Sequence, residues 1–229
     1  VTEGIMANMG VILPKPGYLK RIEQLCRLYG AMFYLDETVT GFRVAPGGCA
    51  ELYDLKPDIV TYGKALGAGL PMAAIAGPDH VMSGLEWGKV LHYGTHNAGR
   101  LSLAVTKTML EVMLADDRAN YTKLAHLGQA MAEAIRNVSK GHNRHRVIVQ
   151  GVNSMFQVFF TDAGEIADYR DYSNFVRHAK FRDFAVRLFD KGIYMSPSPS
   201  LHSLSSIVHT EDDIAQTAKA VGEVLDEMP

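Results

Sequence analysis

Two side chains that could carry chemistry follow neighbouring apolar segments of the chain. Asp36 ends the run "AMFYLD", residues 31–36, and Lys64 follows the run "DIVTYG", residues 58–63. A lysine held in a dry site is pushed toward its neutral, nucleophilic amine, and a carboxylate can serve as a buried counter-ion. Each residue taken alone could instead be an ordinary solvated charge at the end of a strand.

Two further segments contain residue types that suit a bulky or phosphorylated ligand. Gly67 and Gly69 follow Lys64 in "TYGKALGAGLP", and glycines let a planar ligand approach the backbone closely. In "HYGTHNAGRLS", residues 92–102, Gly94 and Thr95 precede an expected helix. Backbone N–H groups and a hydroxyl at such a place can bind a phosphate, although this signal is weak by itself.

The first half of the chain predicts an α/β sheet that would position these residues. Residues 16–29 have a helical apolar face, and short apolar runs of strand length cover residues 31–36, 58–63 and 72–77. Strands separated by helical or looped crossovers favour a largely parallel, buried sheet. Ligands of such sheets bind beyond the carboxyl ends of the strands, where Asp36 and Lys64 both fall.

The second half predicts a smaller α+β unit. We expect helices over residues 99–115, 121–138, 181–192 and 209–225, and two strands within residues 145–162 that are separated at Gly151. Thr210 followed by Asp213 fits a capping box at the start of the last helix.

Composition excludes several classes of function. The 229 residues include 47% hydrophobic and 21% charged residues, with a net charge of −2, so no basic surface for nucleic acid is indicated. No apolar stretch reaches the length of a membrane span. The two cysteines have no metal-type spacing, so we expect no metal site and a reducing, cytoplasmic compartment.

Five segments together resemble one family in order and spacing. They are "EGIMANMGVILPKPGYLKRI", "LDETVTGFRV", "YGKALGAGLP", "SMFQVFFTD" and "HTEDDI". The chain resembles the class III aminotransferases that bind pyridoxal 5'-phosphate (PLP), and within them the glutamate-1-semialdehyde 2,1-aminomutases and their relatives. This resemblance implies a PLP-dependent transferase of fold type I that transfers amino groups, as an aminotransferase or as an aminomutase, which is an isomerase.

The resemblance also implies a domain organisation and an assembly. Residues 1–115 would form the C-terminal part of the large domain with its mixed or parallel sheet, and residues 116–229 the small C-terminal α+β domain. Family chains are about twice as long, and this one opens inside a strand-like run without an initiator Met. We therefore expect a fragment that lacks the N-terminal half and is inactive alone, from a homodimer with a shared active site and a small amino or keto substrate.

Two residues receive catalytic roles from the resemblance. Asp36 would lie beside the pyridine nitrogen of PLP and keep it protonated, which makes the ring an electron sink. Lys64 would form the Schiff base with the cofactor aldehyde and would shuttle a proton once the substrate amine has displaced it.

Four more residues are implied to bind the cofactor. Asn8 would lie near the phenolic oxygen, and Thr38 would lie against the ring face, where the family usually has Val. Thr95, with Gly94 before it, would bind the phosphate and reach across to the site of the neighbouring subunit.

One departure from the family pattern concerns the substrate. The aminomutases carry a Glu near the substrate amine, a few residues after a Pro-Ser pair. Leu201 stands at that position here, and no carboxylate lies between Pro197 and Thr210. The sequence therefore favours an amino acid substrate other than the semialdehyde.

Two other interpretations compete with this one. "AMFYLDE" resembles a Walker B strand, but the chain contains no G-x-x-x-x-G-K-[ST] loop, which excludes an ATPase of that type. A non-catalytic relic or interaction module of the same fold stays open. Glu37 is expected to be structural, whereas Arg43 could pair with a nearby carboxylate or bind a substrate acid group.

Overall fold

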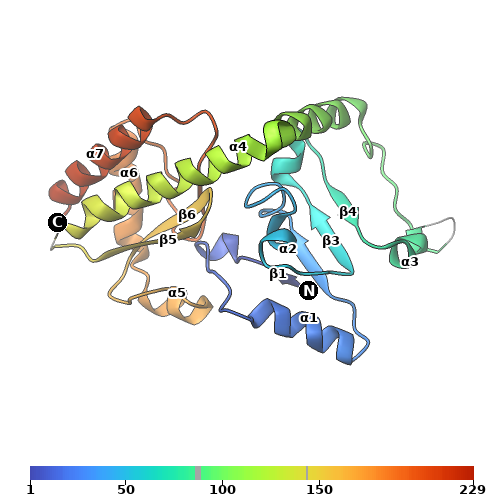
Figure 1. The fold of residues 1–229 in the computed structure, drawn as a ribbon. Helices are drawn as coiled ribbons and strands as arrows, with labels where there is room; N and C mark the ends of the chain where they lie inside the picture. Colours follow the sequence, from blue (N-terminus) through green and yellow to red (C-terminus); the bar gives the residue numbers. More distant parts are fainter. Residues whose placement is uncertain (86–88, 143) are drawn as a thin grey trace. The chain divides into compact units, whose positions relative to one another are not determined.

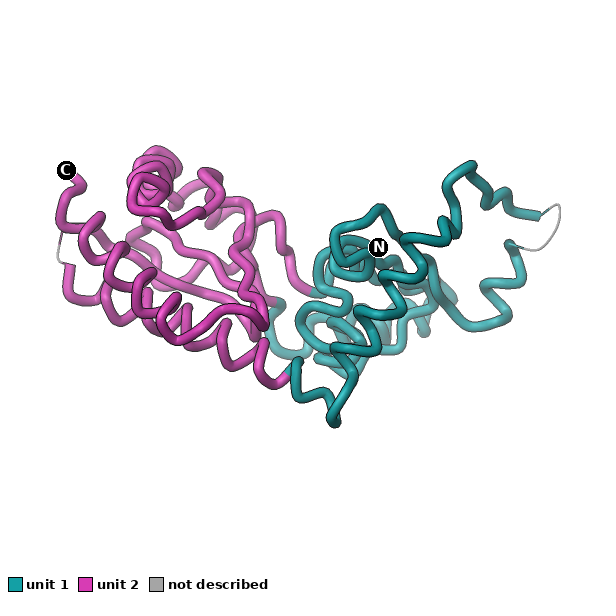
Figure 2. Tube along the Cα trace, turned by 90° about the horizontal axis from the view of Figure 1, so that it is seen from above, with its two compact units in different colours: residues 1–4, 14–121 teal, residues 5–13, 122–229 magenta. Residues whose placement is uncertain are grey.

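The computed structural model describes residues 1–85, 89–142 and 144–229. The chain divides into two compact units (Figure 2). The first unit contains residues 1–4 and 14–121, and the second contains residues 5–13 and 122–229. The short segment 5–13, with the 3₁₀ turn η1 (Ala7–Met9), therefore belongs to the second unit, although it lies near the start of the chain.

A four-stranded sheet forms the centre of the first unit (Figure 1). Its order is β1 (Thr2–Glu3), β2 (Tyr34–Glu37), β3 (Ile59–Tyr62) and β4 (Ala74–Ala76). The pairs β1–β2 and β2–β3 are parallel, as the sequence predicts, but β4 runs antiparallel to β3. The connection over residues 63–73 explains this, because a parallel crossover needs about a dozen residues or more.

Helix α1 (Tyr18–Leu28) is tied to the sheet through one buried carboxylate. Asp58, just before β3, accepts a hydrogen bond from the backbone N–H of Phe33 at 2.7 Å. Its other oxygen accepts from Arg27 of α1 at 2.8 Å. These bonds, with the positive charge of Arg27, lower the pKa of Asp58, so the carboxylate stays charged and fixes the start of β2 and β3.

The remaining helices of the first unit are short, except for the beginning of α4. They are α2 (Gly48–Leu52), η2 (Lys64–Gly67), α3 (Asp79–Met82) and η3 (Ser83–Leu85). Helix α4 (Arg100–Lys140) is interrupted at Ala115–Arg118, where the backbone is not helical. The break falls between the two helices expected from the sequence.

The second unit is built on a three-stranded antiparallel sheet (Figure 1). Its strands are β5 (Val147–Val152), β6 (Met155–Phe160) and β7 (Ser203–Leu204), and its helices are α5 (Tyr169–Phe175), α6 (His178–Asp190), α7 (Glu211–Glu227) and the last part of α4. Every residue of β6 is buried. Apolar side chains from the strands and helices share one core, among them Ile135, Val158, Phe160, Phe184, Leu188 and Val224.

The turn between β5 and β6 differs from the sequence prediction. Gly151 does not separate the strands, because it lies inside β5 and pairs with Phe156. The reversal occurs after Val152, where Asn153 has a φ of 50°. Asparagine tolerates this left-handed conformation, so the Asn-Ser pair and not the glycine makes the turn.

Helix α7 begins as its sequence predicts. The hydroxyl of Thr210 accepts a hydrogen bond from the backbone N–H of Asp213, and the Asp213 side chain accepts one from the backbone N–H of Thr210. The expected capping box is thus confirmed. Helix α5 was not expected from the sequence, and its signal is Asp168, whose side chain accepts from the backbone N–H of Asp171.

No helix within the described ranges combines the length and the apolar composition needed to cross a membrane.

The close backbone approach at Gly151 gives a test of the second unit. A Cβ at Gly151 would lie 2.2 Å from the carbonyl oxygen of Met155 and 2.5 Å from the Cα of Phe156. Because backbone atoms cannot move aside cheaply, we expect Gly151→Ala to lower the free energy of unfolding by about 2–3 kcal/mol in urea titrations. Gly164→Ala is the control, since a Cβ there meets nothing within 4 Å. Equal stability of the two variants would contradict this register.

Candidate active site

The sheet of the first unit brings Asp36 and Lys64 to the same edge. In the parallel pair β2–β3, Asp36 lies opposite Thr61, and Glu37 lies opposite Tyr62. Lys64 comes two residues after the end of β3. Parallel strands end at a common edge, so both side chains stand at the carboxyl ends of adjacent strands. The positive charge of Lys64 is among the causes that lower the pKa of Asp36, so the two groups interact.

The surroundings of Asp36 hold it in its charged form. Burial opposes the charge, but hydrogen bonds from Thr38 and Thr61, with the nearby Lys64, outweigh it and lower the pKa of Asp36 below its usual value. The backbone N–H of Thr38 donates to Oδ1 at 2.8 Å, and the hydroxyl of Thr61 donates to the same oxygen at 3.3 Å. Asp36 is therefore an anion at neutral pH.

Lys64 lies on a strained turn that the structure fixes from several sides. Its φ of 45° is in the left-handed region, which a side chain other than that of glycine rarely adopts. Such strain persists only where the surroundings enforce it, and it often marks functional positions. Thr106 of α4 donates to the carbonyl oxygen of Leu66 in the same turn at 2.9 Å. A Cβ at Gly63 would lie 3.4 Å from the methyl group of Thr38, which therefore stands beside the base of Lys64.

Glu37 has a different, structural position. Its side chain is fully buried and accepts hydrogen bonds from the hydroxyl of Thr40 and, at 2.7 Å, from the backbone N–H of Ala50 at the start of α2. Burial raises the pKa of Glu37 against these bonds. A Cβ on Gly48 would overlap the carboxylate at 2.4 Å, so only glycine lets α2 approach it.

Three further predicted cofactor residues, Gly94, Thr95 and Asn8, lie on exposed turns. Gly94 and Thr95 are exposed on a turn before α4, where the backbone N–H of Asn97 donates to the carbonyl of Gly94. Asn8 is exposed in η1 of the second unit.

Thr61 bonds to Asp36, and the phenol of Tyr34 donates to the Thr61 hydroxyl at 3.0 Å, but the sequence indicates neither residue. Thr61 touches Asp36 only through the register of β2 against β3, which no local pattern reveals. Arg43 is partly buried, which lowers its pKa, and it interacts electrostatically with Tyr121.

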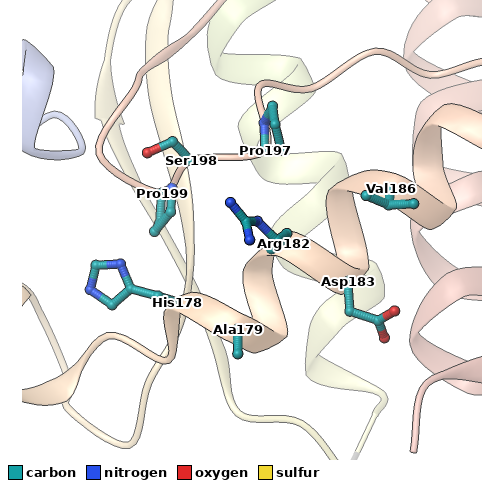
Figure 3. Close-up of a pocket in the computed structure, with 8 residues that line it drawn as sticks. All are labelled: His178, Ala179, Arg182, Asp183, Val186, Pro197, Ser198 and Pro199. Atoms are coloured by element: carbon teal, nitrogen blue, oxygen red, sulfur yellow. The ribbon is translucent and has the colours of Figure 1, made fainter.

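A separate pocket of about 690 Å³ lies in the second unit, between α6 and the segment Pro197–Pro199. Arg182 of α6 points toward this segment (Figure 3). None of the predicted site residues lines the pocket. Within the part of the chain that is described, no group of three or more His, Cys, Asp or Glu side chains could hold a metal ion.

Comparisons with known proteins agree on one family. The family model described as "Aminotransferase class-III" matches residues 1–225. The glutamate-1-semialdehyde 2,1-aminomutase of Anaeromyxobacter sp. (strain K) is 36% identical over 223 residues, which cover 96% of this chain and 50% of that protein. The chain thus spans about half the length of the curated relatives that it matches.

Solved structures show the same fold. A β-phenylalanine aminotransferase from Variovorax paradoxus superposes with a TM-score of 0.87 at 23% identity and covers 99% of this chain and 51% of that one. A transaminase solved with PLP bound superposes with a TM-score of 0.79 at 24% identity. The match covers 95% of this chain and 50% of that one. The expected fold-type-I transferase fold is confirmed, and the chain belongs to the class-III aminotransferase family.

Proposed function

We propose that this chain supplies the lysine and the ring-facing carboxylate of a PLP-dependent enzyme that transfers amino groups, as an aminotransferase or an aminomutase. One observation carries this proposal most strongly. A carboxylate held as an anion and a lysine on a strained turn stand at the ends of two adjacent parallel strands. Family membership makes PLP the cofactor that such a pair would serve.

The residues of this edge fit the chemical groups of PLP. The anionic Asp36 suits a protonated ring nitrogen, and the primary amine of Lys64 suits an aldehyde. The Thr38 methyl group next to Gly63 offers an apolar contact for the ring face. When bound, PLP would supply an electron sink for the bond that breaks at the substrate carbon.

Within this arrangement, each side chain has a distinct task. Asp36 would hold a proton at the ring nitrogen, because an anion with a lowered pKa attracts that proton without taking it up itself. Lys64 would bind the cofactor covalently and, once released, its Nζ would carry a proton to and from the substrate. Glu37 would not react, since Thr40 and the start of α2 occupy its oxygens.

The segment around Leu201 supports a substrate other than glutamate 1-semialdehyde. The buried amide of Gln157 donates to the carbonyl oxygens of Pro199 and Leu201, at 2.8 Å each, and so fixes the segment. The Leu201 side chain is 44% exposed, and it offers no charge to a substrate amine. We propose an amino acid, or its keto counterpart, that is recognised without a carboxylate at this position.

We also propose a homodimer in a cytoplasmic setting. The exposed position of Thr95 on a turn suits a phosphate contact in a neighbouring subunit. Cys26 and Cys49 are free, which suits a reducing compartment.

Covalent attachment of PLP to Lys64 is the primary test. The full-length protein that contains this chain is incubated with PLP, reduced with borohydride and digested. The masses of the peptides are then determined by mass spectrometry. We expect the reduced cofactor on the peptide that contains Lys64 and its loss in Lys64→Ala. Lys56→Ala, an exposed lysine of the same unit, should label like the natural protein. Labelling that persists in Lys64→Ala would contradict the proposal.

The charge of Asp36 gives a second test. We expect Asp36→Asn to weaken PLP binding about 10- to 100-fold at neutral pH, the value of a charge-assisted hydrogen bond. Because the pKa of Asp36 is lowered, its charge is present above the usual carboxyl pKa and is lost only as the pH falls through that lowered pKa. The deficit should therefore stay constant down to about pH 5 and shrink only in stronger acid.

Binding is measured by equilibrium titration across this pH range. Asp54→Asn is the control, because that side chain is 90% exposed. A variant of Asp36 that binds PLP as tightly as the Asp54 control would refute the role of the carboxylate.

Mixed dimers test whether Thr95 acts across subunits. When Lys64→Ala and Thr95→Ala chains are co-expressed in equal amounts, half of the dimers are mixed, and each mixed dimer regains one intact site if Thr95 serves the neighbour. About a quarter of all sites should then retain reducible PLP, although each variant alone retains little. If Thr95 serves its own subunit, no intact site forms and the mixture stays as poor as the single variants.

A further inference from the structure

A chain of hydroxyl groups ends on the carboxylate of Asp36. The phenol of Tyr34 donates a hydrogen bond to the hydroxyl of Thr61 at 3.0 Å. That hydroxyl in turn donates to Oδ1 of Asp36 at 3.3 Å. Both bonds are formed within the first unit, by side chains of β2 and β3.

The sheet geometry makes this chain a specific arrangement. Tyr34 and Asp36 are two residues apart in β2, so their side chains lie on one face, and Thr61 stands directly opposite Asp36 in β3. Leu35 and Glu37 alternate with them and are fully buried on the other face. The phenol therefore reaches the same face of the sheet as the proposed ring-binding carboxylate.

We propose that Tyr34 is a positioning residue, which acts through the Thr61 hydroxyl to hold Asp36 in its charged form beside the ring nitrogen of the cofactor. The role at the cofactor rests on the proposed function, but the hydrogen bonds from Tyr34 to Thr61 and from Thr61 to Asp36 do not depend on it. Neither Tyr34 nor Thr61 was among the site residues that the sequence indicated.

The physical reason is the freedom of a hydroxyl group. The threonine proton can rotate toward any nearby acceptor, and its oxygen has lone pairs of its own to satisfy. When the Tyr34 phenol donates to that oxygen, the Thr61 proton is directed to Asp36, and each bond of the chain polarises the next. A carboxylate has about four acceptor positions, so the hydrogen bonds from the Thr61 hydroxyl and from Thr38 leave room for a donor from a ligand.

The stabilisation matters because the carboxylate is half-buried. Burial alone would raise the pKa of Asp36, and a neutral carboxyl could not keep a ring nitrogen protonated. The Thr61 hydroxyl is one of the groups that reverse this effect. Removal of the Tyr34 phenol, which orients the Thr61 hydroxyl, should therefore raise the pKa of Asp36 without altering the backbone of either strand.

The test measures the pKa of the Asp36 carboxyl in the cofactor-free, full-length protein by NMR titration with ¹³C-labelled aspartate, assigned with Asp36→Asn. We expect Thr61→Val to raise this pKa by about one unit and Tyr34→Phe by about half a unit. Tyr62→Phe is the matched control, because its phenol is on the same strand as Thr61 but beside Gly41 on the opposite face. It should leave the pKa of Asp36 unchanged.

The inference is overturned if Tyr34→Phe titrates like the natural protein and like Tyr62→Phe. Urea unfolding of the three variants checks that any change is local, and similar midpoints are expected. Because this titration needs no PLP, it distinguishes failure of the inference from failure of the proposed function. A second titration follows PLP affinity, which should fall in the order natural protein, Tyr34→Phe, Thr61→Val. Equal affinity of all three would likewise count against the role of Tyr34.

Discussion

The parallel pairing of β2 with β3 is the interaction on which the site depends. It sets Asp36 opposite Thr61 and brings Lys64 just past the end of the neighbouring strand. Strand alternation then separates the two adjacent carboxylates, since Asp36 lies on the same face of the sheet as Tyr34, whereas Glu37 is buried on the other face. A shift of one residue in this register would move Asp36 to the buried face of the sheet and Glu37 to the opposite face.

Each acid is stabilised in a way that suits its place. The oxygens of Glu37 accept hydrogen bonds from the Thr40 hydroxyl and the Ala50 backbone N–H, so this side chain stabilises the local fold. Oδ1 of Asp36 accepts hydrogen bonds from the Thr38 amide and the Thr61 hydroxyl, and Asp36 attracts Lys64. The backbone at Lys64 is strained, and it lies on a turn that α4 holds through Thr106.

The sequence predicted much of this and failed where long-range pairing decides. Apolar runs and the capping residues of α7 are local signals, and they located the strands and helices well. The prediction of a turn at Gly151 is wrong because the glycine allows two strands to approach closely. The prediction of a parallel β4 is wrong because a short connection reverses the chain direction after β3. Motif spacing indicates Asp36 and Lys64 as candidate site residues, whereas the contacts of Thr61 and Tyr34 become visible only through the register.

The central claim is that Asp36 and Lys64 act on one aromatic ring. A crystal structure of the full-length protein, reduced with borohydride after PLP binding, tests it most directly. The account predicts a covalent bond from Lys64 Nζ to the cofactor and the ring nitrogen within hydrogen-bonding distance of the Asp36 carboxylate. Density that shows the ring nitrogen facing another group, or the cofactor bound away from this edge of the sheet, would contradict it.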